Sequence, residues 1–212
     1  MPGRNQHILP QEFYARDPRI VARELLGKIL VRTLSGGART RLSGRIVEVE
    51  VYLGDGDLAA HSAAGKTARN EVLFGPPGHA YVYFIYGVHY CLNFSCMLEG
   101  QAGSVLLRAI EPLEGMAEMA KARGVSAQQV HSISGRRLLT SGPGRVCQAL
   151  GITRARFNGQ KLYARDSELK IVADDWHPPE IRETLRIGIT KSAELPLRYL
   201  IRDNQFVSGR RT

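Results

Sequence analysis

The sequence predicts a single α+β domain, built on a curved, mainly antiparallel β-sheet with a protruding β-hairpin and flanking helices. Strand-like segments follow one another across short turns, and only a few segments carry helix signals, which is typical of α+β proteins rather than of alternating strand–helix folds. The chain has 212 residues, enough for one substantial core. No repeat or linker divides it, so residues 1–212 are expected to form one domain, with residues 1–10 flexible.

The N-terminal part of the chain carries the signals of one helix and a long hairpin. Asp17 can cap the helix, Pro18 suits its first position, and Gly27 can end it. Alternation and turn residues then predict a strand at 28–34, a turn at Ser35-Gly36-Gly37, a strand at 41–52, and a polar loop at 54–79 that ends in the breaker Gly75-Pro-Pro-Gly78.

The rest of the chain predicts a second hairpin, two helices and further strands. The hairpin turns at Gly87-Val88, between strands at 80–86 and 89–96. The elements expected after it are a turn at 99–103, a strand at 104–110, helices at 112–123 and 143–150, and strands at 169–173, 185–189 and 197–201.

Composition excludes several classes of protein. Three cysteines do not make a disulfide framework, so a reducing compartment fits. No apolar run approaches the roughly 20 residues of a membrane helix, and residues 1–10 lack the apolar core of a signal peptide. His61, His79 and His89 lack metal-ligand spacing, and nucleotide-binding glycine patterns are absent. We therefore expect no metal, no cofactor and no membrane contact.

Basic residues are concentrated in one stretch. The net charge is +9, and from Lys121 to Arg165 there are nine Lys or Arg residues and no Asp or Glu. A solvated basic face is the ordinary explanation, but so long a stretch favours contact with a polyanion. Ser141-Gly-Pro-Gly144 precedes a helix whose free amides could bind an anion. The candidate phosphate contacts are Arg136, Arg137, Ser141 and Arg145.

Two carboxylates stand inside a β-branched strand. Side chains alternate faces along a strand, so Ile46, Glu48, Glu50 and Tyr52 share one face, and the intervening valines form the core face. Spacing alone favours a solvated outer face for the glutamates. Beside a strongly basic surface, they alternatively suggest chemistry on a nucleic-acid base. Spacing does not choose between Glu48 and Glu50.

The next strands carry further candidates. Tyr83 can be half-buried packing or a pocket wall, whereas Tyr86 lies near the hairpin tip, where an exposed aromatic is unusual unless it inserts into something. Asn93 lies inside a strand, where asparagine is rare. Arg108 is a charge in an apolar strand and needs an anionic partner if it is buried.

Long motifs across the chain carry a family resemblance. They are Arg45-Ile-Val-Glu-Val-Glu-Val-Tyr-Leu-Gly54, Ala59-Ala-His-Ser62, Tyr81-Val-Tyr-Phe-Ile-Tyr-Gly87, Cys91-Leu-Asn93, Val105-Leu-Leu-Arg-Ala-Ile-Glu-Pro112, and Ser141-Gly-Pro143 with Leu150. Together they strongly resemble the alkyladenine (3-methyladenine) DNA glycosylase family. Order and spacing agree from about Phe13 to the C-terminus, so the resemblance covers nearly the whole chain.

The resemblance implies a monofunctional DNA glycosylase of base excision repair. Such an enzyme flips alkylated or deaminated purines out of duplex DNA and hydrolyses the N-glycosidic bond, leaving an abasic site. By position, the resemblance implies that Glu50 is the general base that activates water against the deoxyribose C1′ and that Arg108 helps to hold that water. It implies that the extruded base is sandwiched by Tyr52, His61 and Tyr83, and that Asn93 discriminates against the guanine 2-amino group. Tyr86 would be the wedge in the minor groove. No role transfers to Glu48.

The resemblance also implies partners and a setting. The expected partner is double-stranded DNA with a damaged purine, bound by a monomer. Its location would be cytoplasmic and nucleoid-associated in a bacterium, or nuclear in a eukaryote. The chain has no long N-terminal extension, so it looks like the catalytic core alone, as in bacteria. No lysine matches a Schiff-base position, so we expect no lyase activity. The loop at 62–70 and the tip residues Val88-His89 depart from the family pattern, which leaves the lesion preference open.

Two other functions fit parts of the sequence. A non-catalytic binder of damaged or single-stranded nucleic acid would use the same basic surface and tyrosines. A nucleic-acid-binding module of a larger enzyme would need only the fold, which by itself does not establish function. Glu50 and Arg108 argue against simple binding, because binding alone needs neither.

Overall fold

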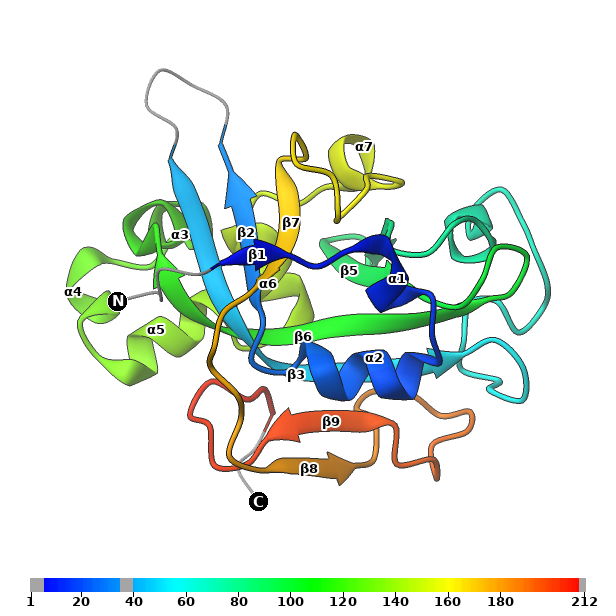
Figure 1. The fold of residues 1–212 in the computed structure, drawn as a ribbon. Helices are drawn as coiled ribbons and strands as arrows, with labels where there is room; N and C mark the ends of the chain where they lie inside the picture. The colour runs from blue at the N-terminus through cyan, green and yellow to red at the C-terminus, as the bar shows by residue number, and fades with distance from the viewer. Residues whose placement is uncertain (1–5, 35–39, 210–212) are drawn as a thin grey trace.

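The structure is a computed structural model that describes residues 6–34 and 40–209, which form one open sheet of nine strands with short helices around it (Figure 1). The strands are β1 (His7–Ile8), β2 (Ile29–Thr33), β3 (Arg41–Leu53), β4 (Ala80–Ile85), β5 (His89–Ser95), β6 (Gly103–Glu114), β7 (Leu169–Ala173), β8 (Ile181–Thr184) and β9 (Arg198–Ile201). The helices are α1 (Gln11–Tyr14), α2 (Pro18–Leu25), α3 (Met116–Arg123), α4 (Ala127–Val130), α5 (Ile133–Thr140), α6 (Pro143–Ala149) and α7 (Arg154–Phe157), with a 3-10 turn η1 (Glu71–Phe74). The predicted α+β class is confirmed.

The sheet is organised around the long strand β3. The strand order is β1-β7-β2-β3-β6-β5-β4, and every described pair is antiparallel. One edge of β3 pairs with β6 along its length, whereas the other edge pairs first with β2 and then, at Glu48–Glu50, with β9. β3 bends between these two partners (Figure 1). The register between β3 and β6 is irregular on both sides of Glu48.

One face of the sheet carries the hydrophobic core. Val47, Val49 and Val51 of β3 are fully buried on it, as their alternation predicts. Among the helices whose buried side chains join this core are α2, with Val21, Ala22 and Leu25, and α6, with Val146 and Cys147. α2 begins as predicted, because the Asp17 carboxylate accepts a 2.8 Å hydrogen bond from the backbone N–H of Arg19. The opposite face of the sheet is therefore the one left for polar residues.

Two predicted elements are wrong in the structure. The helix predicted over 112–123 begins only at Met116, because β6 continues its ladder with β3 as far as Glu114. Proline has no backbone N–H to donate, but Pro112 is tolerated there. β5 pairs with β6 only at Ser104–Leu106, so at Pro112 the β5 side of β6 is a free edge that needs no donor. The strand predicted at 185–189 is irregular, and the strand lies just before it, at Ile181–Thr184.

The sequence prediction also missed short elements. β1 pairs with β7, which differs from the prediction that residues 1–10 form a flexible segment, since at least His7 and Ile8 are hydrogen-bonded in the sheet. α4 and α5 follow the serine caps Ser126 and Ser132, a signal that the prediction did not use. The turn predicted at Ser35-Gly36-Gly37 lies outside the described residues. Within the described ranges, no helix combines the length and apolar character that crossing a bilayer requires.

Candidate active site

The face of the sheet opposite the core collects the predicted site residues. Residues opposite each other in an antiparallel ladder share a face. Glu50 lies opposite Leu106 of β6, which lies opposite Asn93 of β5, and Asn93 in turn lies opposite Tyr81 of β4. By the same alternation, Tyr52 and Tyr83 lie on this face, and the contacts described below place Glu48 and Arg108 there too.

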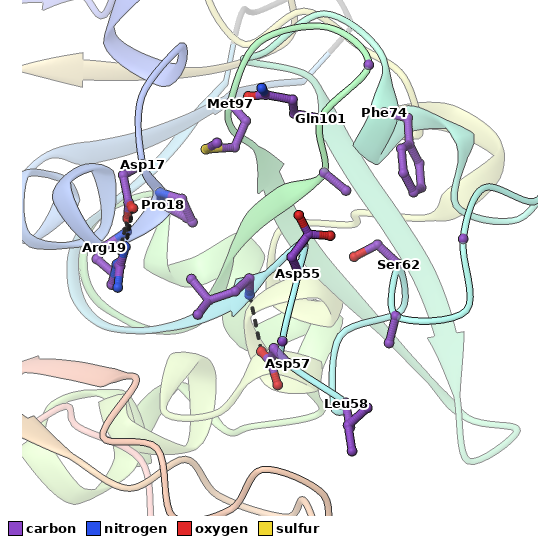
Figure 2. Close-up of a pocket in the computed structure, with 17 residues that line it drawn as sticks. Asp17, Pro18, Arg19, Asp55, Asp57, Leu58, Ser62, Phe74, Met97 and Gln101 are labelled. Atoms are coloured by element: carbon purple, nitrogen blue, oxygen red, sulfur yellow. Dashed lines mark hydrogen bonds and ion pairs between the residues drawn. The ribbon is translucent and has the colours of Figure 1, made fainter.

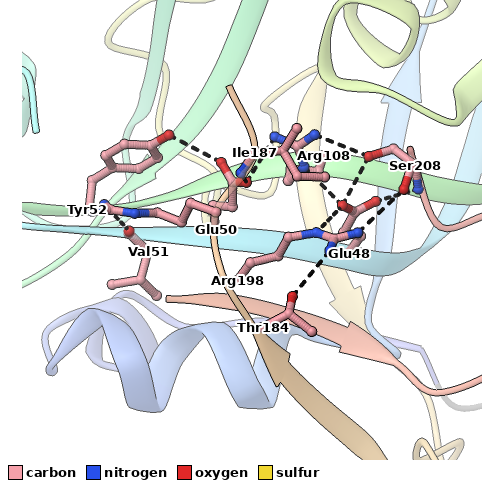
Figure 3. Close-up of polar contacts among 10 residues, drawn as sticks. Glu48, Glu50, Val51, Tyr52, Arg108, Thr184, Ile187, Arg198 and Ser208 are labelled. Atoms are coloured by element: carbon pink, nitrogen blue, oxygen red, sulfur yellow. Dashed lines mark hydrogen bonds and ion pairs between the residues drawn. The ribbon is translucent and has the colours of Figure 1, made fainter. Parts of the chain in front are cut away.

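Glu48 and Glu50 are fully buried on this face. The solvated outer face that spacing favours for them is therefore wrong. The physical reason is that a distant part of the chain covers them. Ile187 bonds to Glu50, and Arg198 and Ser208 bond to Glu48 (Figure 3). Buried carboxylates are costly unless they are paired and hydrogen-bonded, and this cover supplies the partners.

Glu48 is held by two arginines and a serine. Its Oε1 accepts from Arg108 Nε at 2.9 Å, Arg198 Nε at 2.7 Å and the Ser208 hydroxyl at 2.9 Å. Its Oε2 accepts from the backbone N–H of Ser208 at 2.5 Å. Four donors thus hold Glu48, three of them on Oε1 and one on Oε2.

Glu50 is held by three donors. Its Oε1 pairs with Arg108 Nη1 at 2.9 Å and accepts from the backbone N–H of Ile187 at 2.8 Å. Its Oε2 accepts from the Tyr52 hydroxyl at 3.1 Å. One of about four lone-pair sites therefore remains on Oε2, beside Tyr52. The geometry distinguishes what spacing does not. The free site of Glu50 lies beside Tyr52 and has room for one more donor, such as a water molecule, whereas the bonds of Glu48 go to Arg108, Arg198 and Ser208.

Arg108 joins the two carboxylates. Burial tends to lower the pKa of Arg108, but the carboxylates of Glu50 and Glu48 outweigh it, so its pKa is raised and the guanidinium stays charged. Arg198 supplies a second positive charge next to Glu48. The cluster of Glu48, Glu50, Arg108 and Arg198 is thus balanced in formal charge.

An aromatic cavity opens next to Glu50. The predicted pocket residues Tyr52, His61, Tyr83 and Asn93 all line it, so the structure brings them together. Its volume is about 20 Å³, which is room for about one water molecule. The ring centres of His61 and Tyr83 are 4.4 Å apart. A space for one water molecule does not admit a purine, so the aromatic walls of the cavity must move apart before a base can enter.

Asn93 carries an unused donor into this cavity. Its side chain is almost fully buried, and its Nδ2 has no hydrogen-bond partner among the described residues. An unsatisfied buried donor costs about 1–3 kcal/mol. A ligand acceptor, or a water molecule, would remove that cost, which fits a role in recognition.

Hydrogen bonds from the Asn70 side chain hold the part of the loop at 54–79 that carries His61. The buried Asn70 side chain donates to the carbonyl oxygens of His61 at 2.8 Å and Gly65 at 2.9 Å, and accepts from the backbone N–H of Thr67 at 2.6 Å. His61 Nδ1 shares a 2.9 Å hydrogen bond with the Tyr81 hydroxyl. Opening of the cavity therefore works against a loop that is pinned by its own hydrogen bonds.

The pKa of His61 should respond to Arg69. Burial lowers the pKa of His61, and the charge of Arg69 lowers it further. The folded state then binds fewer protons on His61 than the unfolded chain does below about pH 6.5, so this residue costs stability as the pH falls through that range and costs nothing above it. We expect Arg69→Ala to raise the pKa of His61. Histidine ring NMR signals, assigned with His61→Asn, measure the change, and Lys66→Ala in the same loop is the control. A pKa of His61 that is unchanged in Arg69→Ala would contradict the expectation.

A larger hollow is lined in part by the same loop (Figure 2). It has a volume of about 590 Å³ and shares Ser62 with the aromatic cavity. Asp17, Asp55 and Asp57 are among its lining residues, with Arg19 as its one basic lining residue among those described. Its acidic lining makes it a poor site for a phosphate, and it has no paired aromatic rings, so the smaller cavity is the candidate for a base.

The hairpin of β4 and β5 presents Tyr86 at its tip. Tyr86 is 83% exposed. Tyr86 and Gly87 both have positive φ, 51° and 67°, which is the pattern of a type I′ turn. A bulky residue in this region of φ is strained, and the observed position matches the exposed tip predicted from the sequence.

Some of the predicted phosphate-contact residues lie near this hairpin, and others do not. Ser141 pairs with Ala109 in a β-bridge, next to Arg108, and is mostly buried. Gly144 lies against the hairpin, because a Cβ at this position would lie 2.9 Å from the His89 ring. The next residue along the chain, Arg145, is exposed. Arg136 lines a separate groove with Lys121 and His131. Contact of Arg136, Arg137, Ser141 and Arg145 with DNA stays a prediction.

Sequence reasoning missed several residues of the site. Arg198 and Ser208 hold Glu48, Ile187 bonds Glu50, and Tyr81 bonds His61. Arg198 could have been found by the signal that identified Arg108, because each is a charged residue in a strand-like segment. The backbone N–H of Ile187 and the side chain of Ser208 carry no sequence signal of their own.

Comparison with known proteins gives the family. The family model described as methylpurine-DNA glycosylase (MPG) matches residues 12–205. A protein of Koribacter versatilis (strain Ellin345), named "Putative 3-methyladenine DNA glycosylase", is 58% identical over 203 residues, which cover 96% of this chain and 94% of that protein. Proteins of the same name from Methanoculleus marisnigri and Chlorobaculum parvum are 46% and 45% identical and cover 95% and 96% of this chain, and 99% and 91% of their own lengths. The resemblance seen in the sequence is thereby confirmed, and the chain belongs to the methylpurine-DNA glycosylase family.

Proposed function

We propose that this protein is a monofunctional DNA glycosylase of base excision repair, a hydrolase that removes alkylated or deaminated purines from duplex DNA. The substrates would be of the 3-methyladenine, 7-methylguanine, hypoxanthine and ethenoadenine class. The observation that carries the proposal is the buried Glu50 carboxylate, which keeps a free acceptor site and is bonded to Tyr52, a wall of the aromatic cavity. The family relationship supports the same reaction.

The proposed reaction is hydrolysis at the deoxyribose C1′. Glu50 accepts a proton from a water molecule, whose oxygen forms the new bond to C1′. The glycosidic bond to the base breaks, and its electron pair leaves with the base. Arg108 Nη1, held on Glu50 at 2.9 Å, is placed to orient the same water. A base alkylated at N3 or N7 is cationic and departs as a neutral molecule, whereas a neutral lesion also needs a proton from a donor.

Positive charge on the base fits the cavity. Aromatic faces attract cations, and Tyr52, His61 and Tyr83 surround the cavity that we propose for the extruded base. Burial raises the pKa of Tyr52 and of Tyr83, so both phenols stay neutral. Asn93 has the free donor that could read the edge of the base.

The base must first leave the duplex, and Tyr86 is the proposed wedge. Flipping a base costs a few kcal/mol, least for a damaged pair, and aromatic wedges in the minor groove hold the distorted duplex. The basic residues Arg136, Arg137 and Arg145, with Ser141, are proposed to contact phosphates. We propose that the single domain acts on DNA as a monomer.

Replacing the wedge should separate duplex from single-stranded DNA. We expect Tyr86→Ala to slow excision from duplex DNA by about tenfold or more, because it removes a contact that offsets part of the unstacking cost. Excision of the same lesion from a single strand should change little. Tyr86→Phe, which keeps the ring, is the matched control and should resemble the unaltered protein. Equal losses on both DNA forms would argue against a wedge.

An alkali assay tests the proposed function directly. The purified protein is incubated with duplex DNA that carries one hypoxanthine or ethenoadenine, and the DNA is then heated in alkali. Strand cleavage at the lesion that needs the alkali step indicates release of the base without lyase activity. A covalent adduct trapped with borohydride would overturn the monofunctional assignment. Binding without release, on these substrates and on alkylated genomic DNA, would instead indicate a damage sensor.

A further inference from the structure

A second buried ion pair lies behind Tyr52. Arg186 is 6% exposed and Asp57 is 1% exposed. The guanidinium and the carboxylate form two parallel bonds, Nη1 to Oδ2 at 2.6 Å and Nη2 to Oδ1 at 2.8 Å. Asp57 also accepts from the backbone N–H groups of Leu53 and Ala59, each at 3.1 Å. Four donors thus hold the carboxylate in one position.

Arg186 ties three parts of the site together. Besides Asp57 in the loop at 54–79, it donates to the Val51 carbonyl of β3 and to the Ser192 carbonyl of the C-terminal segment, each at 3.0 Å. The next residue, Ile187, gives its backbone N–H to Glu50. The position of Arg186 therefore helps to set the donor on the proposed general base.

The same guanidinium covers one side of the Tyr52 ring. Its central carbon lies 4.8 Å from the ring centre. Tyr52 lines the aromatic cavity, but Arg186 does not, so the ring separates the guanidinium from that space. A base stacked on the cavity side, roughly 3.5 Å from the ring, would lie about 8 Å from the Arg186 charge.

At that distance an uncompensated charge would matter. With an effective dielectric constant of about 20, two positive charges about 8 Å apart weaken binding by roughly 10- to 30-fold. Burial tends to lower the pKa of Arg186, but Asp57 outweighs it and raises the pKa, so the arginine is charged. The adjacent carboxylate of Asp57 is what cancels this charge.

We propose that Arg186 and Asp57 form a positioning pair with a role in substrate choice. Arg186 fixes the Tyr52 ring and the Ile187 amide, and Asp57 neutralises the guanidinium so that the cavity accepts a cationic, N3- or N7-alkylated purine as well as a neutral one. The inference rests on the proposed function, since it names which substrates of that reaction depend on the pair.

The test compares a cationic with a neutral lesion. Single-turnover excision rates are measured on duplexes that carry one 7-methylguanine or one hypoxanthine. Asp57→Asn leaves the guanidinium uncompensated, so the rate ratio of cationic to neutral lesion should fall by roughly 10- to 30-fold. Arg186→Gln leaves the carboxylate instead, so the ratio should rise. The double variant should return the ratio toward that of the unaltered protein, with slower excision of both lesions because the positioning is lost.

A matched ion pair controls for lost stability. Asp174 pairs with Arg45, which lies over the Trp176 ring at 4.6 Å, and Asp174 accepts from the backbone N–H of Trp176. Asp174→Asn is thus the same change in a similar setting away from the cavity, and it should leave the rate ratio unchanged. If Asp57→Asn does not fold, the rise expected for Arg186→Gln still tests the charge argument.

The outcomes separate the two proposals. Equal losses on both lesions in the Asp57 and Arg186 variants, or no change in the ratio, would overturn the role in substrate choice while leaving the glycosylase proposal standing. An unaltered protein that releases neither base, on these or on alkylated genomic DNA, would overturn the proposed function and this inference with it.

Discussion

Glu50→Gln should abolish base release while lesion binding survives. Glutamine cannot take the proton from water, and general-base catalysis is typically worth about 10²–10⁴-fold, so the excision rate should fall by at least that range. The change removes one buried charge beside Arg108, which keeps its ion pair with Glu48, so the fold should survive at reduced stability. The amide oxygen can still accept from Arg108 and Ile187, and the amide nitrogen can donate to the Tyr52 hydroxyl in place of the present bond.

The measurement needs rate and binding on the same DNA. Alkali-dependent cleavage at hypoxanthine gives the excision rate, and fluorescence anisotropy with the same duplex gives the affinity. Glu111→Gln, at a partly buried β6 residue outside the contacts of Glu50, is the control and should excise normally. A Glu50→Gln protein that still excises at a comparable rate would show that another group activates the water.

Local patterns in the sequence predict which face each side chain takes. Alternation put Glu50 and Tyr52 on the face opposite the buried valines, where the ladder from β3 to β6 places them. This works because side chains alternate strictly along a strand. Alternation was wrong for Ile46, which joins the core beside the two register shifts at Glu48. Asp17 and Pro18 predicted the start of α2 because a cap is a local interaction.

Burial of the glutamates could not be read from alternation, because their partners lie far along the chain. Glu48 bonds to Arg198 and Ser208, which are 150 and 160 residues away, and Glu50 bonds to Ile187, 137 residues away. A strand pattern shows that one face is polar, but it does not show whether water or another segment covers that face. The family resemblance singled out Glu50, and its bond to Tyr52, a wall of the aromatic cavity, gives a physical reason for it.

The same long-range contacts explain the wrong strand at 185–189. Leu185 to Ile189 alternates like a strand, yet Arg186 turns inward to Asp57 and the backbone of Ile187 donates to Glu50. The first bond takes a side chain that a surface strand would leave exposed. The second takes a backbone N–H that a β-ladder would use. The tertiary contacts of the site therefore override the local pattern, and the departure falls at the residues that hold the candidate active site.

Glu48→Gln should destabilise the protein far more than a surface substitution does. If the amide oxygen replaces Oε1, it can still accept from Arg108 and Arg198, but the amide nitrogen then meets the backbone N–H of Ser208, donor against donor. The flipped amide places its N–H groups against two guanidinium groups, which is worse. The change also leaves Arg108 and Arg198 with one carboxylate fewer. Breaking a buried ion pair from one side typically costs about 3–5 kcal/mol, and we expect a loss of that size.

Urea unfolding at equilibrium measures this loss as a shift of the midpoint at constant slope. Glu180→Gln is the matched control, because Glu180 pairs with Arg202 at the surface, where a pair contributes about 0–1 kcal/mol. If Glu48→Gln were no more costly than Glu180→Gln, the buried cluster would not depend on Glu48, and Arg108 would need another anchor. Excision by the folded fraction of Glu48→Gln should persist, in contrast to Glu50→Gln, because Glu48 bonds to Arg108, Arg198 and Ser208, whereas Glu50 bonds to Tyr52, which lines the aromatic cavity. The pair of variants thus assigns one carboxylate to the chemistry and the other to the framework that holds Arg108 in place.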